Sequence, residues 1–434
     1  MLYTIIVSCI ALLAMITLII VKPSIRIGNH EYDTFYLPIL LGAIIIMFNP
    51  EFDKSELKEI VFSNSKLNPI KILLLFISIS FLSISLDESG FFSYIASKYI
   101  NRFKSSQYAL FFGLYLLISI LTIFTSNDIV ILTFTPFILY FSKKGNINPI
   151  PYLVMEFVAA NTYSIILPIG NPTNIYLTSI FSIDFLTYIK HMIIPALVIG
   201  LSSIGMFFLL FRNDLKKEIV VLDIEEAKIK DKVGCIISLI VLASTTILLV
   251  ISNYIDLEMW IIASMAALLL LIFLIVYTII RHDRHYFINP IKRIPYSLIP
   301  FILSMFIIIL SLNQFGLFKN IYNSIENIGN ERVRYIVYLL SSTLSSNIVN
   351  NIPMTIGFGS ILLNSTNMNY VYLSIIGSNI GAILTPLGAL AGIMWMRILK
   401  HNNVKYNFLD FTKNGVIILG PVLILLILYV FFIW

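Results

Sequence analysis

Polar side chains interrupt long apolar runs at a few points in the chain, and these points are the candidates for chemistry. The first cluster, Ser126-Asn127-Asp128, offers hydroxyl, amide and carboxylate oxygens, which suit Na⁺, a proton or a small polar solute. Because an ionisable side chain at membrane depth is a candidate functional residue by default, we expect Asp128 to face a binding site. The alternative is that this cluster only caps the helix predicted at 129–143.

A second cluster lies where a helical run is interrupted at 167–174, with the sequence Leu-Pro-Ile-Gly-Asn-Pro-Thr-Asn. Proline removes a backbone donor and glycine permits a turn, so this segment predicts a broken helix. We expect Gly170 to form the turn, and Asn171, Thr173 and Asn174 to line a polar pocket. The helix that follows would direct its N-terminus inward, which attracts anions. The alternative is a proline kink packed between helices.

The same features return later in the chain. Asn161, Pro168 and Gly170 share the spacing N-x6-P-x-G with a second set, Asn379, Pro386 and Gly388. Asn127-Asp128 likewise corresponds to Asn350-Asn351. The candidate ion- or substrate-binding residues of the second half are Asn347, Asn350, Asn351, Ser378, Asn379, Thr385 and Gly388. For Asn161 and Asn379, contact with a ligand and packing between helices are equally open, because a buried amide must hydrogen-bond to something.

Three further acidic residues lie at or near membrane depth. Glu156 is either a proton carrier or, as we favour, a partner of Lys143 or Lys144 near the inner surface. Asp87 and Glu88 end an apolar run and precede Gly90, which indicates a structural corner.

The composition explains why so few polar residues stand out. Of the 434 residues 58% are hydrophobic and 12% are charged, whereas a soluble domain has about 25% charged residues. The sequence therefore predicts an all-α polytopic membrane protein. The two cysteines form no metal-binding or disulfide pattern. There is no phosphate-binding loop and no catalytic triad or metal-ligand spacing at depth, so we expect neither an enzyme nor a cofactor.

About ten runs have the length of a membrane span, which is about 20 residues. Eight are continuous and two, at 150–181 and 369–399, are broken; the continuous runs are 2–21, 33–49, 69–86, 192–212, 233–252, 258–280, 297–312 and 415–434. Two further pairs break at polar clusters, 107–125 with 127–143 and 331–346 with 352–364. We interpret each pair as a re-entrant hairpin, because irregular backbone inside a membrane requires polar surroundings.

The net charge of +6 serves as an orientation signal. With both termini outside, most of the 29 Lys and Arg residues fall on the inner side, as the positive-inside rule requires. These residues occupy short loops between apolar runs, so we expect no nucleic-acid partner. The first run, with Lys22 and Arg26 after it, is not a signal peptide.

The halves predict an inverted repeat. We divide the chain into N-terminal spans outside the repeat (1–68), a first repeat (69–212), a charged inner loop with two linking spans (213–296), and a second, inverted repeat (297–434). Each repeat would hold a span, a surface helix (91–104 or 317–329), a hairpin, a broken span, a second surface helix and a final span. Such repeats are common in secondary transporters, with the substrate near the midplane.

Several of these motifs resemble the arsenite/antimonite efflux permeases of the ion transporter superfamily. They are LDESGFF (86–92), Asn127-Asp128 followed by Leu132-Thr133, LSSNIVNNIP (344–353), and GSNIG (377–381) running on to Thr385-Pro386-Leu387-Gly388. The resemblance implies an elevator-like transporter with two hairpins and two broken helices, often dimeric, with functional positions at the hairpin tips. The break Gly-Asn-Pro-Thr-Asn at 170–174 is more similar to the anion- or sodium-coupled relatives. Typical arsenite permeases have aspartates at the positions that resemble Asn161 and Asn379, so two buried carboxylates are replaced by amides here.

We therefore expect an ion-coupled secondary transporter of the cell membrane that works by alternating access. Its substrate would be the neutral trihydroxy species of As(III) or Sb(III), exported against protons. The alternatives are a small oxyanion, such as a di- or tricarboxylate, moved with Na⁺ or H⁺, or a cation/proton antiporter. From another class, a channel is possible, but an inverted repeat does not require one. The expected partners are this ion, the coupling ion, membrane lipid and a second copy of the chain.

Overall fold

The computed structural model describes residues 2–27, 30–62, 68–103, 106–219, 226–252, 254–282, 285–363 and 365–434. Three basic residues of the charge count, Lys66, Lys104 and Arg284, lie outside the described residues, as does 220–225 in the predicted charged loop. The described residues form twenty α-helices, two short 3₁₀ turns and one two-stranded β-hairpin. The all-α prediction is thus confirmed except at the β-hairpin, β1 (Ser24–Ile27) with β2 (His30–Asp33).

The helices of the first half follow one another with few residues between them. They are α1 (Leu2–Val21), α2 (Tyr36–Met47), α3 (Lys54–Phe62), α4 (Pro69–Glu88), α5 (Phe91–Phe103), α6 (Gln107–Phe124), α7 (Asn127–Lys144), α8 (Ile150–Tyr163), η1 (Pro168–Gly170), α9 (Pro172–Ile180) and α10 (Phe185–Leu215).

The second half likewise contains ten α-helices and one 3₁₀ turn. They are α11 (Lys232–Val250), α12 (Met259–Arg281), α13 (His285–Lys292), α14 (Leu298–Gln314), α15 (Leu317–Glu326), α16 (Glu331–Val349), α17 (Asn351–Leu362), α18 (Met368–Gly381), η2 (Pro386–Gly388), α19 (Leu390–His401) and α20 (Phe408–Ile433).

Seven helices of the described residues are long and apolar enough to cross a membrane, and an eighth span exists if α14 and α15, bent by 69°, count as one. Six of them match predicted continuous spans. The seventh is α6, which we had assigned to a hairpin. The predicted span at 33–49 contains only the 12 residues of α2, and the two broken spans consist of short halves.

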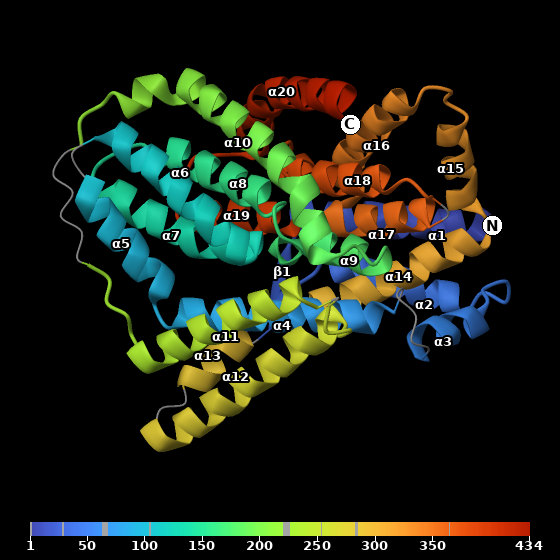
Figure 1. Cartoon of the computed structure of the whole chain (residues 1–434), viewed down its shortest axis with the longest axis horizontal. Helices are drawn as coiled ribbons and strands as arrows, with labels where there is room; N and C mark the ends of the chain where they lie inside the picture. The colour runs from blue at the N-terminus through green and yellow to red at the C-terminus, as the bar shows by residue number, and fades with distance from the viewer. Residues whose placement is uncertain are drawn as a thin grey trace.

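Matched glycines set the two sharpest corners. Gly90 after α4 has φ +87° and Gly316 after α14 has φ +74°, which other residues rarely adopt. Each corner turns the chain into a helix that is exposed on one side, α5 or α15. Both surface helices were predicted from the sequence, and in Figure 1 they lie at opposite ends of the molecule, where they join two layers of helices.

The helices form two layers. In Figure 1 the lower layer contains α2, α4, α11, α12 and α14, and the upper layer contains the helices of the hairpins, the broken helices, α10 and α20. Within the lower layer the halves pack reciprocally, since α12 packs on α4 as α2 packs on α14. In the upper layer α7 packs on α19, and α17 packs on α9. Each half thus completes the packing of the other.

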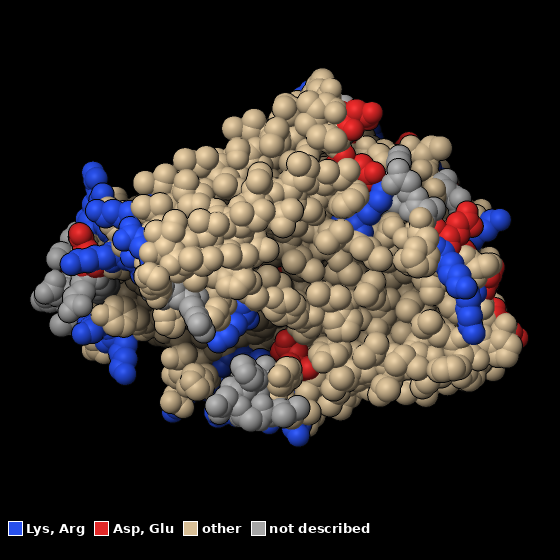
Figure 2. Space-filling model, turned by 90° about the horizontal axis from the view of Figure 1, so that it is seen from below, with Lys and Arg blue, Asp and Glu red and all other residues tan. Residues whose placement is uncertain are grey.

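Charge is distributed unevenly on the surface. Figure 2 shows that uncharged residues cover most of one face, and that Lys and Arg gather mainly at its left end. A broad uncharged surface of this kind suits contact with lipid.

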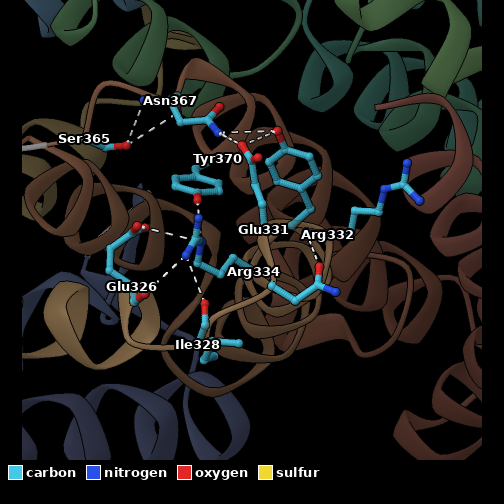
Figure 3. Close-up of polar contacts among 10 residues, drawn as sticks. Glu326, Ile328, Glu331, Arg332, Arg334, Ser365, Asn367 and Tyr370 are labelled. Carbon is cyan, nitrogen blue, oxygen red and sulfur yellow. Dashed lines mark hydrogen bonds and ion pairs between the residues drawn. The ribbon is translucent and has the colours of Figure 1, made fainter.

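The base of the second hairpin is fixed by polar contacts. Figure 3 shows the Arg334 guanidinium between the Tyr370 hydroxyl, to which its Nε donates over 2.8 Å, and the carbonyl oxygen of Ile328, 2.9 Å from Nη1. Nearby, the Asn367 amide donates to Glu331 over 2.7 Å. Farther along, a Cβ at Gly377 would lie 1.9 Å from the Ser342 Oγ, so glycine is needed where α16 and α18 touch.

Candidate functional site

Both broken helices are interrupted in the same way. α8 ends at Tyr163 and α18 ends at Gly381. After each of these helices the chain makes a 3₁₀ turn before the next helix begins. The turn glycines are required by space, because a Cβ at Gly170 would lie 2.3 Å from the Ser164 carbonyl oxygen, and one at Gly388 would lie 2.7 Å from that of Gly381. The breaks predicted from the sequence are therefore present, and each turn requires its glycine.

Asn379 of α18 is bound by the first break. Its Oδ1 accepts from the Asn171 amide (2.9 Å) and the Ser164 hydroxyl (3.2 Å), and its Nδ2 donates to Asn174 Oδ1 over 2.7 Å. The second Nδ2 proton goes to the Ile375 carbonyl oxygen. Asn379 is wholly buried, and these four hydrogen bonds use the whole capacity of an amide. In this conformation Asn379 joins the two repeats and has no group left for a ligand.

The remaining polar side chains of the first break are equally engaged. The Asn174 amide donates to the Ser164 carbonyl oxygen over 2.8 Å, and the Asn171 Oδ1 accepts from the Thr173 backbone N–H and so caps α9. The Thr173 hydroxyl donates to Asn174 Oδ1. The predicted pocket of Asn171, Thr173 and Asn174 is thus filled by its own hydrogen bonds and by Asn379.

Asn161 connects this cluster to the first hairpin. Its Oδ1 accepts from the Asn127 amide over 3.1 Å, and its Nδ2 donates to the Phe157 carbonyl oxygen. Asn127 is 1% exposed, yet its own Oδ1 has no hydrogen-bond partner among the described residues. An unpaired buried acceptor is unfavourable, and it is a natural ligand for a cation or for a donor on a substrate.

The second break forms a separate cluster. Asn347 Oδ1 accepts from the Thr385 hydroxyl over 2.7 Å, and its amide donates to the Gly381 carbonyl oxygen over 3.0 Å. The Asn350 amide donates to the Leu387 carbonyl oxygen over 3.0 Å. Among the described residues, no side-chain hydrogen bond joins this cluster to the first.

The tip of the second hairpin differs from the sequence-based expectation. We placed the tip across 345–353, but α16 continues to Val349, and only Asn350 interrupts the helices, with φ +75° and ψ 154°. That conformation is nearly confined to glycine and stores strain. Asn350 Oδ1 caps α17, and the next residue, Asn351, has a buried Oδ1 without a partner in the described chain. Ser378 contacts the Thr355 hydroxyl at 3.3 Å.

The first hairpin tip faces a cavity of about 620 Å³. Ser126 and Asp128 line it, together with residues of α4, α19, the β-hairpin and the segment that precedes α14. Within the described residues, neither the Ser126 hydroxyl nor the Asp128 carboxylate forms a hydrogen bond or an ion pair. Ser126, not Asp128, is the N-cap residue of α7, and no side chain caps that helix. Asp128 therefore lines the cavity, and the capping interpretation does not hold for it.

Five charged side chains line the cavity. Arg293 binds Asp87 (2.7 Å) and Glu88 (2.6 Å), and the Thr133 hydroxyl of α7 donates to the same Asp87 over 2.9 Å. The structural role predicted for Asp87 and Glu88 thus consists of an ion pair with Arg293. The charged lining residues are Lys292, Arg293, Arg397, Asp33 and Asp128. Arg397 contacts Asp33 at 3.3 Å, so the β-hairpin is attached to α19.

The large cavity, between the first hairpin and the second broken helix, has a counterpart between the second hairpin and the first broken helix, and this counterpart is closed. The sequence pattern pairs Asn127-Asp128 with Asn350-Asn351, but α7 begins at Asn127 and α17 begins at Asn351. Counted from these first residues, Asp128 corresponds to Ile352 and Leu132 to Ile356, which corrects the earlier pairing by one residue. Counted from the two turn glycines, Leu390 corresponds to Pro172 and Met394 to Tyr176. The first member of each pair lines the large cavity, and the second lines a void of only about 10 Å³. The contact between a hairpin and the broken helix of the opposite half is therefore open at the large cavity and sealed, mainly by apolar side chains, at its counterpart.

Glu156 contradicts the interpretation that we favoured. It is 0% exposed, and its carboxylate oxygens lie 3.1 Å from the Thr135 hydroxyl of α7. No ion pair with Lys143 or Lys144 exists, and both lysines lie at the exposed end of α7. The sequence placed Glu156 one turn inside the helix, but it gave no measure of how deeply α7 and α19 would cover it.

Sequence reasoning missed several participants. Ser164 and Thr355 bind predicted residues, and Arg293 and Arg397 line the cavity. Ser164 directly precedes the first break, so its place was a usable signal. Arg293 and Arg397 had been counted only as loop charges, because the sequence does not indicate which loop folds back over the hairpin tip.

Helices of spanning length, two breaks at matched positions and a cavity that ends at a helical hairpin are typical of a multi-pass membrane transporter. The comparisons with known proteins agree. The sequence matches the citrate transporter family (CitMHS) over residues 2–374, and the chain belongs to this family. The family moves small ions across membranes.

Known relatives cover most of the chain. It is 26% identical over 373 residues to the arsenical pump membrane protein of Escherichia coli (strain K12), which corresponds to 80% of this chain and 83% of that protein. The arsenical pump membrane protein of Yersinia enterocolitica is 25% identical over 367 residues, with the same two shares. Among solved structures, the YdaH transporter of Alcanivorax borkumensis has a TM-score of 0.58 at 12% identity, covering 100% of this chain and 98% of that one. This last likeness concerns the fold.

The hydrogen bonds of Asn379 lead to a prediction for Asn379→Asp. The new carboxylate would place an oxygen where Nδ2 now donates to Asn174 Oδ1 at 2.7 Å. The Asn174 side chain cannot rotate to present its Nδ2 to the new carboxylate, because that Nδ2 already donates to the Ser164 carbonyl oxygen. We expect the variant to lose about 1–3 kcal/mol of stability at neutral pH, measured as a lower melting temperature in detergent.

The control is Asn330→Asp, at the N-cap position of α16. Asn330 is exposed, and its Oδ1 accepts from the Arg332 backbone N–H. A carboxylate caps the helix in the same way and favours its N-terminus, so the melting temperature should be unchanged. Equal stability of the two variants would show that the Asn379–Asn174 contact does not have the assigned role.

Proposed function

We propose that this chain is an ion-coupled secondary transporter that works by alternating access, with its substrate site at the inner end of the large cavity. The observation that carries the proposal is the pair of matched positions, one an open cavity of about 620 Å³ and the other a sealed void of about 10 Å³. If the two halves exchanged conformations, the open position would close and the sealed one would open. Inverted repeats in transporters permit such an exchange.

The repeat on which this exchange depends extends, we infer, over the whole chain. Ten helices before the 216–231 connection correspond in order to ten after it, from α1 with α11 to α10 with α20. Reciprocal packing supports this alignment, since α1 and α2 pack on α14, and α11 and α12 pack on α4. Residues 1–68 and 213–296 would then be the first members of the two repeats, which replaces our four-part division.

Ion coupling is assigned to the first hairpin tip. Ser126, Asn127 and Asp128 are consecutive, and each has polar atoms without a partner in the described chain. Oxygens from a hydroxyl, an amide and a carboxylate can bind Na⁺, and Asp128 alone can bind a proton. The matched tip has Asn351 but Ile352 in place of an acid, so Asp128 is the only carboxylate of the two hairpin tips.

For the substrate, the lining favours a small oxygen-rich solute. Three basic and two acidic side chains line the cavity. The α19 N-terminus also adjoins it through Leu390, and no side chain caps this helix, whereas Asn171 caps α9. Free backbone N–H groups bind oxyanions and neutral oxyacids. Neutral As(III) or Sb(III) hydroxides fit this chemistry, and so do small carboxylates. The names of the relatives point to both groups.

The orientation follows from the charges. Lys292, Arg293 and Arg397 lie on the side that the positive-inside rule assigns to the cytoplasm, so the cavity would open inward. The termini would lie outside the cell membrane. A second copy of the chain is a further expected partner.

The substrate proposal predicts selective stabilisation of the purified protein. We expect one class of small oxyacid or oxyanion to raise the melting temperature in a panel of arsenite, antimonite, citrate, succinate and sulfate, each with Na⁺, Li⁺ or neither cation. Binding to the folded state alone stabilises it by about 2.7 kcal/mol at 100 times Kd. Stabilisation by arsenite without Na⁺ would support proton-coupled export, and a carboxylate that requires Na⁺ would support symport. If no compound raises the melting temperature, the substrate class is wrong.

Asp128→Asn tests ion coupling. The variant keeps the shape of the side chain but cannot carry a charge or exchange a proton. We expect gradient-driven uptake into proteoliposomes to be abolished while the melting temperature stays within the error of wild type. The control, Asp214→Asn at the exposed end of α10, removes only an i,i+3 pair with Lys217 and should transport normally. Coupled transport by Asp128→Asn at the wild-type rate would refute the assignment.

Single cysteines at matched positions test alternating access. In a background without Cys9 and Cys235, Leu132→Cys lines the open cavity and Ile356→Cys lines the sealed void. A water-soluble thiol reagent should label Leu132→Cys many times faster at rest. Substrate with its ion gradient should slow that labelling and speed the labelling of Ile356→Cys. Rates that do not respond to transport would argue for a fixed pore instead.

A further inference from the structure

Glu156 is a buried acid that neither the cavity nor the hairpin tips use. It belongs to α8, is 0% exposed, and lies against α7, where Thr135 is also 0% exposed. The matched residue in α18, counted from Asn161 and Asn379, is Ser374, whose hydroxyl bonds to its own helix. The acid is therefore not a feature that the fold requires in both halves.

The hydrogen bonds of Thr135 indicate the protonation state of Glu156. The Thr135 Oγ1 lies 2.6 Å from the Ile131 carbonyl oxygen, one turn earlier in α7, and 3.1 Å from each Glu156 carboxylate oxygen. A hydroxyl has one proton to donate. The carbonyl oxygen has none, so the shorter contact takes the threonine proton, as is common for threonine inside a helix. The contact with Glu156 then needs a proton from the carboxyl group itself.

The surroundings offer no charge to stabilise an ionised Glu156. Helices α6, α7, α10 and α18 pack against α8. α6 and α18 have no charged residue, and the charged residues and the histidine of α7 and α10 lie near the ends of those helices: Asp128, Lys143, Lys144, Lys190, His191, Arg212 and Asp214. On α19, Arg397 pairs with Asp33. The nearest hydroxyl on α8, that of Tyr152, is occupied by Gln107. An isolated carboxylate in such a place is strongly unfavourable, and the group binds a proton instead.

A hydrogen-bond donor for the charged form of Glu156, unused in this conformation, is nevertheless present. The indole N–H of Trp395, on α19, lies close enough to Glu156 to stabilise a negative charge. In the part of the chain that the structure describes, this N–H makes no hydrogen bond, and Trp395 is 0% exposed. A small approach of α19 to α8 would give the carboxylate one donor. The site thus has an acceptor for the neutral acid, Thr135, and a donor for the anion, Trp395.

We propose that Glu156 is a proton-carrying residue, a neutral carboxylic acid in this conformation that releases its proton when α7 and α19 move. The idea rests on the proposed function, because α7 and α19 also belong to the lining of the large cavity, through Leu132 and Ile393 among others. On release, the O–H bond of the carboxyl group breaks and water of the cavity takes the proton. The carboxylate then accepts from the Trp395 N–H.

Infrared difference spectroscopy of the purified full chain tests the protonation state without any transport. Wild type minus Glu156→Gln should contain the carbonyl stretch of a neutral carboxylic acid, which shifts in D₂O. Glu218→Gln, at an exposed site in the loop after α10, should not remove this band. A carboxylate band in place of the acid band would overturn the proposal, whatever the protein transports.

Proton movement in proteoliposomes tests the release. Glutamine mimics the neutral acid, so Glu156→Gln should fold and bind substrate, but proton flux that accompanies substrate should be lost. Trp395→Phe, which removes only the donor to the anion, should slow proton release several-fold while the acid band remains. Wild-type proton flux in Glu156→Gln would contradict the proposal even if the acid band is present. If Glu156→Gln fails to fold, Thr135→Val decides, because it should keep the acid band but shift its position.

Discussion

Two helices are broken inside the membrane, and each backbone group that a break frees must find a partner within the protein. At the first break the Asn174 amide pairs with the Ser164 carbonyl oxygen. Asn379 from the other half holds the side chains of Ser164, Asn171 and Asn174 in place through three hydrogen bonds. This contact fixes where α18 lies against η1 and α9, and so where both hairpin tips can lie. The requirement also explains why so many buried amides occur in a chain with few buried charges.

The two halves use one plan but differ in chemistry. Asp128 faces the large cavity, whereas Ile352 seals its counterpart. The first break reads Gly-Asn-Pro-Thr-Asn and caps its next helix, while the second reads Gly-Ala-Leu-Ala-Gly and leaves α19 uncapped. Glu156 has no acidic counterpart in α18, where Ser374 occupies the matched position. In the proposed mechanism the first hairpin and the second broken helix bind the substrate and its coupling ion, and the second hairpin and the first broken helix form the opposite gate.

The sequence predicted the parts of the site that depend on local backbone chemistry. Pro168 with Gly170, and their later counterparts, indicate a break because their effect on a helix is local. It did not predict the position of the second tip, because Ser345 to Val349 remain helical despite their polarity. Nor did it reveal that Asn379 binds the first break or that Arg293 covers the cavity, since both depend on how distant helices pack. The β-hairpin escaped notice because two four-residue strands leave little periodicity.

The most direct test of the central claim, that the two matched positions open in turn, is a pair of distances measured between spin labels by double electron–electron resonance. One pair would join Lys144, at the exposed end of α7, to Lys292, which lies at the end of α13 and lines the large cavity. The other pair would join Leu363, after α17, to Glu59 on α3. Gln314 of α14 donates a hydrogen bond to Glu56 of α3, so α3 is attached to α14. Alternating access predicts that substrate with its ion gradient shortens the first distance and lengthens the second. Two distributions that stay the same, or that change in the same direction, would contradict it.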